Sequence, residues 1–230
     1  MSGLGDLFRD ARKRYKITRE RPQLWDFPEY GLGYIQIPKV ATRSLRVSLS
    51  ALPLMDEASD FADFEARNSA HVDKAVIRRR IEEGLFVFAF VRDPFARLYS
   101  AWKDKVDRPA GASGRNIFSC HGVHDRMPFD DFVRRVCELD DRNVDRHLRS
   151  QSWFLCDELG IIPSCIGRLE NFAEDWNFLQ RRFPVLQPVP HRNRTSAAEV
   201  RPKVLDKVTE GLVLERYRSD FKNFGYSMSM

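Results

Sequence analysis

Continuous apolar runs mark the strands that the sequence predicts. Segment 33–38, GYIQIP, is expected to form a buried strand, and segment 85–91, LFVFAFV, carries seven apolar residues in a row. An uninterrupted run of this kind is typical of a central strand that is covered on both faces, as in a parallel sheet. Two further strands are predicted at 152–156 and 162–169, on either side of Gly160.

Between these runs, apolar residues recur every three or four positions and predict helices. After the second strand, Asp93 stands at the cap position and Pro94 at the first helical position, which is a helix start signal. Residues 16–32, which include two prolines, are expected to be an irregular connection, and residues 108–127 a mobile surface loop. The predicted helices cover 3–15, 42–52, 73–83, 94–106, 128–139, 170–183 and about 199–224.

This order of elements predicts an α/β fold. A strand, a loop of anion-binding type and a helix begin the chain's first regular unit, as in α/β nucleotide-binding folds. We expect a P-loop-like fold with a central parallel sheet flanked by helices. No repeat or linker divides the chain, so one domain is predicted over residues 1–230. Within it, 1–32 would form an N-terminal helix and an irregular connection, and 33–226 the motif-bearing core.

Composition and charge narrow the class of function. Hydrophobic residues make up 43% of the 230 residues and charged residues 31%, as in an ordinary globular protein. No apolar run approaches the ~18 residues of a membrane span, and the N-terminus lacks the apolar core of a signal peptide. A cytoplasmic location is therefore expected.

The charge balance favours a small anionic ligand over nucleic acid. The chain has 38 basic and 33 acidic residues, a net charge of +5, and its basic runs are short. A nucleic-acid binder usually concentrates its basic residues in one patch. The four cysteines are dispersed without a C-x-x-C pair, so a zinc site is not expected.

The loop 38–44, PKVATRS, is the first candidate anion site. It lies between a predicted strand and a predicted helix N-terminus, where unpaired backbone N–H groups and the helix dipole attract phosphate-like groups. Lys39 adds a positive charge, while Thr42, Arg43 and Ser44 add further donors. The Walker loop of nucleotide-triphosphate enzymes, G-x-x-x-x-G-K-[ST], places its lysine at the far end, so this loop is of another kind. The alternative is an ordinary turn with an exposed lysine.

A second candidate anion site follows the strand at 85–91. Arg92 ends that strand, and Ser100 lies eight residues further along the predicted helix. Both side chains can reach one group near the carboxyl ends of the strands, where open α/β sheets bind their ligands. Two such sites imply a ligand that is negatively charged at two ends.

These motifs resemble those of a known enzyme family. Pro38-Lys39-x-x-Thr42-x-Ser44, together with RDPFARLYSAWKDK at 92–105, looks like the sulfotransferases that use 3′-phosphoadenosine 5′-phosphosulfate (PAPS). The second motif is closest to the carbohydrate sulfotransferase branch, R-D-P-[YF]-x-R-L-x-S-A-[YW]-x-x-K. Segments 147–156, 166–176 and 217–226 also match in order, so the resemblance spans about residues 33–226. Because relatives in this family reside in the Golgi, the resemblance implies a soluble fragment of a Golgi enzyme as the alternative to a cytoplasmic location.

The resemblance implies a set of donor-binding residues. Arg92 and Ser100 would hold the 3′-phosphate, and Glu170 would orient the donor, unless it forms a structural salt bridge. No metal is expected, because sulfate carries less charge than phosphate and no carboxylate pair is placed to hold magnesium. Arg43 departs from the second threonine that relatives often have. The 5′-phosphosulfate would be held by Lys39 with the amides and hydroxyls of Val40, Ala41, Thr42, Arg43 and Ser44.

A histidine is expected to take the proton of the acceptor hydroxyl, because its pKa of ~6.5 leaves it largely neutral at pH 7. His71 lies in the interval before Arg92 where several sulfotransferase branches keep this base. His147 begins HLRSQSW, which is similar to a histidine motif of carbohydrate sulfotransferases, and is an alternative base or an acceptor-binding residue. His121 and His124 are expected to be solvated, and His191 lies in a loop that either closes over the donor or is a plain loop.

The sequence thus predicts an O-sulfotransferase that moves the sulfuryl group of PAPS to a hydroxyl of a carbohydrate, in line, with Lys39 neutralising the bridging oxygen. A sulfotransferase for a lipid alcohol or a tyrosine is the alternative, followed by a non-catalytic nucleotide- or nucleic-acid-binding module. Four basic residues are candidate contacts for an acidic sugar, or else ordinary surface charge: Lys103, Arg115, Arg126 and Arg149.

Overall fold

The computed structural model of the chain describes residues 4–52, 61–107, 116–188 and 205–228. These residues form two compact units. The sheet unit comprises Arg21–Arg92 and Phe154–Ala197. The helical unit comprises Met1–Glu20, Asp93–Trp153 and Ala198–Met230. The single domain expected over 1–230 stays a prediction, and each unit is described here by itself.

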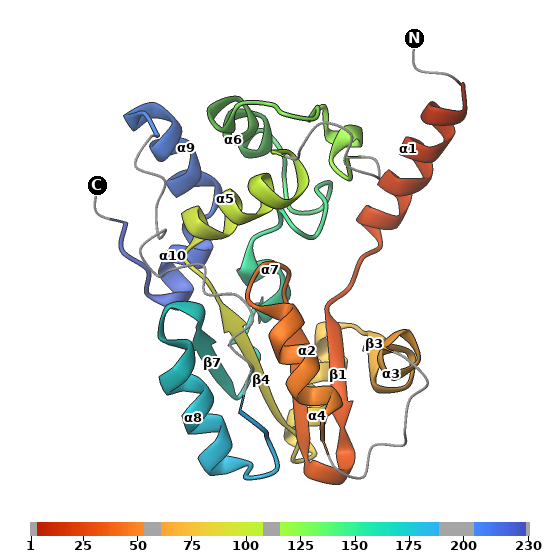
Figure 1. Cartoon of the computed structure of the whole chain (residues 1–230), viewed down its shortest axis with the longest axis vertical. Coiled ribbons are helices and arrows are strands. Elements are labelled where there is room, and N and C mark those ends of the chain that lie inside the picture. The colour runs from red at the N-terminus through yellow and green to blue at the C-terminus, as the bar shows by residue number, and fades with distance from the viewer. Residues whose placement is uncertain (1–3, 53–60, 108–115, 189–204, 229–230) are drawn as a thin grey trace. The chain divides into compact units, whose positions relative to one another are not determined.

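A five-stranded sheet with the order β3-β1-β2-β4-β7 is the centre of the sheet unit (Figure 1). Strands β2, β4 and β7 are parallel, as the apolar runs predict, while β1 is antiparallel to both β2 and β3. A small antiparallel pair, β5 with β6, forms a second sheet. The strands are β1 Gln23–Phe27, β2 Leu32–Gln36, β3 Ser69–His71, β4 Phe86–Val91, β5 Cys156–Asp157, β6 Gly160–Ile161 and β7 Cys165–Arg168.

Helices cover both faces of this sheet. Arg46 of α2 lies over the Trp25 ring, and Phe64 of α3 packs against the same ring at 5.6 Å. On the same face as Trp25, Phe88 stacks on Tyr34, and Trp176 of α8 packs against Phe88. On the opposite face, Arg80 of α4 bonds to Asp26. The layers are visible in Figure 1. The helices are α2 Thr42–Ser50, α3 Phe61–Asn68, α4 Lys74–Glu82 and α8 Phe172–Arg182, with 3₁₀ turns at Pro28–Tyr30 and Leu169–Asn171.

One glycine allows β7 to lie close to its neighbour. A Cβ atom at Gly167 would lie 2.5 Å from the ring of Phe90 on β4. Because a side chain cannot fit there, glycine lets the large Phe90 ring lie over the β7 backbone. Phe90 in turn packs against Phe172 and Trp176, which ties β7 to α8.

The helical unit packs its helices around a shared apolar core. Asp93 caps α5 as predicted, since its carboxylate accepts from the Ala96 amide at 3.0 Å. The core contains Phe95 and Leu98 of α5, Phe132 of α6, and Phe221 of α10. The predicted C-terminal helix is two helices, with residues 199–204 outside the described part. The elements are α1 Leu4–Thr18, α5 Pro94–Lys105, a 3₁₀ turn Ser119–His121, α6 Phe129–Cys137, α9 Lys207–Arg216 and α10 Arg218–Phe224.

Three local predictions were wrong. The supposed irregular connection contains β1, because its prolines bracket the strand QLWDF rather than interrupt it. SWFLC lies mostly in helix α7, Gln151–Leu155, whose first amides bond to the carboxylate of distant Asp220. Residues 116–127 of the supposed mobile loop contain buried Phe118 and Val123, which join the core, while 108–115 lie outside the described residues.

Candidate active site

The loop between β2 and α2 adopts the backbone conformation of a glycine-rich loop without containing glycine. Lys39 has φ 73° and Ala41 has φ 60°, both in the left-handed region that L-residues rarely occupy. Alternating conformations of this kind turn successive N–H groups toward one side and form an anion-binding concavity. Val40 between them is fully buried and anchors the loop.

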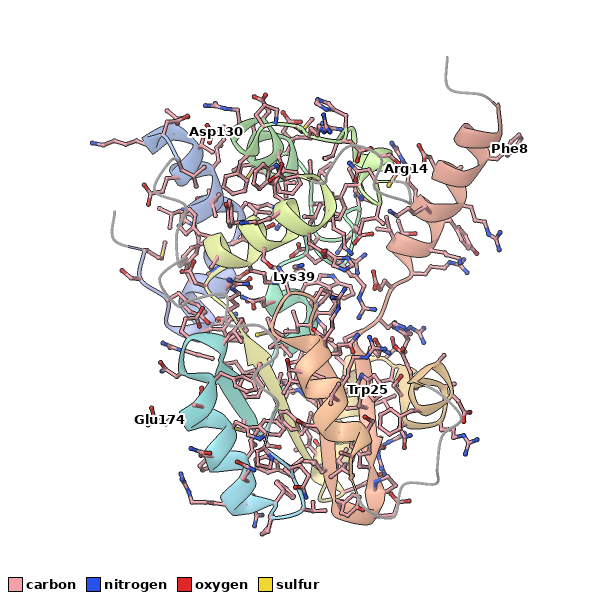
Figure 2. The ribbon with its side chains drawn as sticks, viewed as in Figure 1. Phe8, Arg14, Trp25, Lys39, Asp130 and Glu174 are labelled. Atoms are coloured by element: carbon pink, nitrogen blue, oxygen red, sulfur yellow. The ribbon has the colours of Figure 1, made fainter. Side chains whose placement is uncertain are left out.

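The N-terminus of α2 is not capped by a side chain. Ala41 occupies the cap position and has no side-chain oxygen to accept a hydrogen bond, while its backbone carbonyl accepts from the amides of Ser44 and Leu45. Within the described residues, the amides of Thr42 and Arg43 have no acceptor. These N–H groups and the positive end of the helix dipole suit an external anion. Figure 2 shows Lys39 beside this end of α2.

The strand directions bring three predicted donor-binding residues to one edge of the sheet. Because β2, β4 and β7 are parallel, their carboxyl ends share an edge. Lys39 follows β2 by three residues, Arg92 follows β4 directly, and Glu170 follows β7 by two residues. Arg92 and Glu170 are half-buried, as is Lys39. Residues that are far apart in the sequence thus share the place where open α/β sheets bind ligands.

His71 lies at this same edge. Strand β3 runs in the direction of β2, because both are antiparallel to β1. His71 ends β3 and is in register with Gln23, which is in register with Gln36 at the end of β2. The buried side-chain amide of Gln36 donates to that of Gln23 at 2.9 Å, which links β2 to β1 at this edge.

A backbone contact sets the tautomer of His71. Its Nδ1 lies 3.1 Å from the carbonyl oxygen of Arg21. A carbonyl oxygen only accepts, so Nδ1 carries the proton of the neutral ring and Nε2 carries the lone pair. The side chain is exposed, so Nε2 is accessible for accepting a proton.

Two predicted residues belong to the helical unit. Ser100 is half-buried on α5. His147 is also half-buried, and its Nδ1 lies 2.7 Å from Oδ1 of Asp145. Burial alone would raise the pKa of Asp145, but the hydrogen bonds and charge of His147 outweigh it and hold that pKa well below its usual range. Sequence reasoning did not identify Asp145, although D-R-H places the two side chains within reach.

Two side chains that were expected at the surface, His121 as a solvated group and Arg149 as a sugar contact or surface charge, are buried. His121 is 3% exposed, and its Nε2 accepts from the Asp145 amide at 3.0 Å. Burial lowers the pKa of His121 to about 4. Arg149 is 1% exposed and donates to the carbonyls of Val144 and Ile17, so it is a structural residue rather than a sugar contact.

The other candidates in this group are exposed or lie outside the described residues. His124 is exposed, as predicted. Lys103 and Arg126 are also exposed, and their role as sugar contacts stays a prediction. Arg115 and His191 lie outside the described residues.

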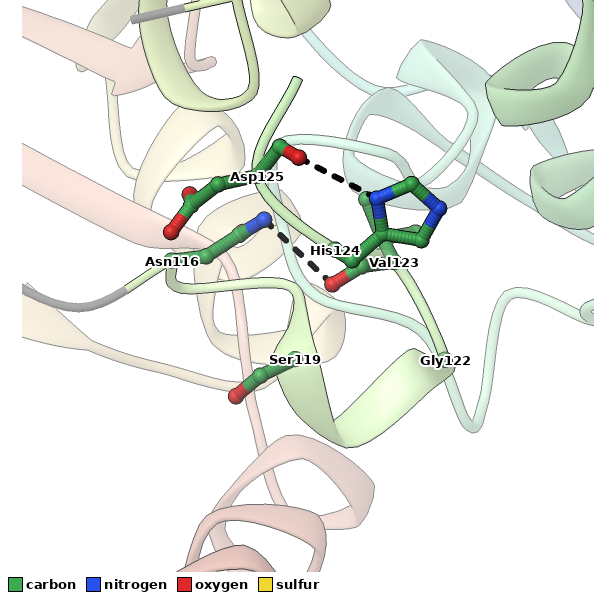
Figure 3. Close-up of a pocket in the computed structure, with 6 residues that line it drawn as sticks. All are labelled: Asn116, Ser119, Gly122, Val123, His124 and Asp125. Carbon is green, nitrogen blue, oxygen red and sulfur yellow. Dashed lines mark hydrogen bonds between the residues drawn. The ribbon is translucent and has the colours of Figure 1, made fainter. Parts of the chain in front are cut away.

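A hollow of about 420 Å³ lies in the helical unit, lined by Asn116, Ser119, Gly122, Val123, His124 and Asp125 (Figure 3). Two of its polar side chains bond to its own backbone. The Asn116 amide donates to the Val123 carbonyl, and His124 Nδ1 lies 3.1 Å from the Asp125 carbonyl. None of the lining residues is a predicted site residue, so we assign the hollow no role.

The described residues contain no group of three or more His, Cys, Asp or Glu residues that could hold a metal ion. None of the described helices combines the length and the apolar character that crossing a membrane requires.

Comparisons with known proteins agree with the motifs. Carbohydrate sulfotransferase 11 of Rattus norvegicus is 23% identical, over 95% of this chain and 71% of that protein. Carbohydrate sulfotransferase 10 of Pongo abelii is 28% identical, over 84% of this chain and 64% of that protein. No solved structure matches the chain. The model of the Sulfotransferase family matches residues 22–227, nearly the whole chain, and this protein therefore belongs to the sulfotransferase family.

Proposed function

We propose that this sulfotransferase moves the sulfuryl group of PAPS to a hydroxyl of a carbohydrate. The observation that carries the proposal is the meeting of the β2–α2 loop and Arg92 at one edge of the sheet, beside a helix N-terminus with unpaired amides. Relatives named carbohydrate sulfotransferases support the acceptor class. A lipid alcohol or a tyrosine is the alternative acceptor.

The residues at this edge fit the donor's charges. The amides of residues 40–43, the Ser44 hydroxyl and Lys39 would bind the 5′-phosphosulfate, as an uncapped helix N-terminus binds other phosphate-like groups. Arg92 would bind the 3′-phosphate from the neighbouring strand, and Glu170 would orient the donor. Ser100 is added to the 3′-phosphate contacts by the family resemblance alone.

The reaction is a displacement at sulfur. The acceptor oxygen attacks the sulfur atom, the bond from sulfur to the bridging oxygen breaks, and 3′,5′-adenosine bisphosphate leaves. Lys39 neutralises the charge that develops on the bridging oxygen, which is the kind of stabilisation that dominates phosphoryl transfer as well. Nε2 of His71 takes the hydroxyl proton, since His71 shares the edge with Lys39 and its tautomer suits a base.

Radiolabelled PAPS and an acceptor panel test this function. The panel contains neutral oligosaccharides, glucuronate-containing oligosaccharides, a lipid alcohol and a tyrosine peptide. We expect label on an oligosaccharide. Label on the alcohol or the peptide alone would replace the carbohydrate with the alternative acceptor, and no label on any acceptor would contradict sulfotransfer.

Two substitutions test the assigned roles. Lys39→Ala should lower kcat about 10²–10³-fold, because it removes a preorganised positive charge from the leaving group. Arg92→Ala should raise the KM for PAPS about 10–100-fold, as expected for the loss of a charge-assisted hydrogen bond. Arg79→Ala is the matched control, since Arg79 is exposed on α4 and pairs with Glu83. Parental kinetics in both site variants would show that the roles are wrongly assigned.

A binding measurement separates donor recognition from catalysis. A specific site should gain thermal stability from 3′,5′-adenosine bisphosphate far more than from AMP, because each ligand stabilises the folded state according to its affinity. Equal shifts with the two nucleotides would argue against a 3′-phosphate site.

A further inference from the structure

Helix α1 has one face that contacts the rest of the helical unit and one face that does not. On the first face, Arg14 donates to the Cys120 carbonyl at 2.7 Å. Lys13 pairs with the Asp145 carboxylate at 3.5 Å and also holds the helix to this unit. Figure 2 shows Phe8 on the side of α1 that points away from Arg14. The outward face is therefore the one that is open to a partner.

Aromatic and basic side chains alternate along this outward face. Residues spaced by four and then three positions lie in one row on a helix, and this spacing joins Phe8, Arg12 and Tyr15. Arg19 directly follows α1 and continues the row, because its Cζ atom lies 4.4 Å from the centre of the Tyr15 ring. All four side chains are exposed, Phe8 by 72% and Tyr15 by 57%. These four residues, the α1 row, extend over about 16 Å.

The protein does not neutralise the positive charges of the α1 row. Lys16 is exposed next to Arg12 and Arg19, at spacings of four and three residues, and adds a third cation to this face. Within the part of the chain that the structure describes, no carboxylate pairs with any of these three side chains. The outward face of α1 thus combines three unpaired cations with two exposed aromatic rings.

This combination fits the surface of an anionic membrane. Aromatic rings enter the boundary between lipid headgroups and acyl chains, and the long arginine and lysine side chains reach the anionic headgroups. A glycan or a single nucleic-acid strand is usually bound in a groove, whereas the α1 row lies on the exposed side of one helix. A second copy of this chain would place cations against cations, which repel each other. Charge and exposure therefore favour a lipid surface over these partners.

We propose that α1 attaches the protein to the surface of an anionic membrane, with the Phe8 ring inserted among the lipids and Arg12, Lys16 and Arg19 at the headgroups. The attachment is separate from sulfuryl transfer and does not depend on the acceptor. Its electrostatic part requires anionic lipid and weakens as salt screens the charges. Its apolar part comes from removing the Phe8 ring from water, which salt does not screen.

Co-sedimentation of the whole chain with lipid vesicles tests the attachment. One set of vesicles contains phosphatidylserine and phosphatidylcholine in equal parts, and the other contains phosphatidylcholine alone. Binding to the first set should be about 100-fold tighter, at about five-fold for each of the three cations. Equal affinity for the two sets, or binding to neither, would overturn the proposal. Binding to soluble hyaluronan but to neither vesicle would replace the membrane with an acidic glycan.

Two double variants assign the electrostatic part to α1. Arg12→Gln combined with Arg19→Gln should weaken binding to the phosphatidylserine vesicles about 25-fold, because two cations are lost. Arg79→Gln combined with Arg218→Gln is the matched control, since both arginines are 65% exposed and the change in net charge is the same. The control should bind as the parent does. Losses of equal size in the two double variants would reduce the contact to the net charge of the protein and overturn the role of α1.

Substitutions of Phe8 test the insertion of its ring. Phe8→Ser should weaken binding to the same vesicles about ten-fold, because an apolar side chain no longer leaves water. Phe178→Ser is the matched control, since Phe178 is 46% exposed on α8, and it should bind as the parent does. Parental binding of Phe8→Ser would contradict the insertion, as would an equal loss in both variants.

Fluorescence of Phe8→Trp reports the surroundings of this position directly. The parent has four tryptophans, so its spectrum is subtracted from that of the variant. The difference emission should move to shorter wavelength when phosphatidylserine vesicles are added, because the indole ring leaves water. An unmoved difference spectrum while the protein is bound to the vesicles would show that position 8 stays in water and would overturn the proposal.

Discussion

Thr42 shows how a hydrogen bond changes the role that a motif assigns to a residue. The family pattern implies that its hydroxyl binds the phosphosulfate, but that hydroxyl donates to the Ile37 carbonyl at 2.8 Å. A hydroxyl has one proton to donate, so the amide of Thr42 is the group left for an anion. Ser44 differs, because its hydroxyl has no partner among the described residues.

This difference predicts opposite effects for two alanine substitutions. Thr42→Ala should lower the free energy of unfolding by about 1 kcal/mol, the usual net value of one hydrogen bond, and leave the KM for PAPS within about two-fold. Ser44→Ala should leave stability nearly unchanged and raise the KM for PAPS about ten-fold. Urea unfolding and initial rates measure the two effects. If Thr42→Ala raised the KM for PAPS while Ser44→Ala did not, the Thr42 hydroxyl would have to bind the donor.

The residues of the loop could be predicted from the sequence, but its conformation could not. Lysine, threonine and serine next to a helix start indicate an anion site by their chemistry. Nothing in lysine or alanine favours a positive φ, so the turns at Lys39 and Ala41 follow from the packing of buried Val40 and from the strand and helix on either side. A search for glycine would have missed this loop.

Elements with a strong local pattern were predicted, and those fixed by distant contacts were not. Strand β4 and the start of α5 were predicted correctly, because each depends on adjacent residues: a continuous apolar run for β4 and an Asp-Pro pair for α5. Strand β3 has three residues and pairs with β1 alone, which no local pattern reveals. The start of α7 depends on Asp220, 69 residues away from Gln151.

Hydrogen bonds from Tyr217 and Asp220 to residues 148–152 predict that segment 217–226 stabilises the helical unit. Asp220→Ala leaves two buried amides without an acceptor and should lower the free energy of unfolding by about 3 kcal/mol. Tyr217→Phe removes one buried hydrogen bond and should cost about 1 kcal/mol. Denaturant titrations measure both. Arg218→Ala is the control, because its exposed pair with Glu215 contributes little. Similar unfolding midpoints for all three variants would show that Tyr217 and Asp220 do not stabilise residues 148–152.

At the scale of the whole molecule, one sequence motif is divided between two structural units. Arg92 ends the sheet unit, and Asp93 to Ser100 belong to the helical unit. The two candidate bases are divided in the same way, with His71 on β3 and His147 in the helical unit. Sequence order ranks both histidines as candidates because it carries no information on their partners. The structure supplies these partners: His71 is in register with Gln23, and His147 bonds to the Asp145 carboxylate.

His121 links the stability of the molecule to pH. Its pKa of about 4 in the folded state lies below the ~6.5 of an unfolded histidine, because burial disfavours the charged ring. Between these two values the unfolded chain binds a proton that the folded chain does not, so the stabilisation is complete above pH 6.5 and is lost as the pH falls toward 4. The difference in pKa corresponds to at most about 3 kcal/mol. Asp145 does not titrate in this window, since His147 holds its pKa well below the usual range.

His121→Gln isolates this contribution, because a glutamine oxygen can accept from the Asp145 amide and has no titratable proton. Urea unfolding at pH 7.5, 6, 5 and 4 should show the parent protein losing up to about 3 kcal/mol more than the variant on acidification. His124→Gln should behave as the parent does, since His124 is exposed three residues further along the same loop. If the parent and His121→Gln lost stability in parallel, His121 would have to take up its proton in the folded state, and its ring could not be the buried neutral acceptor that fixes the Asp145 amide.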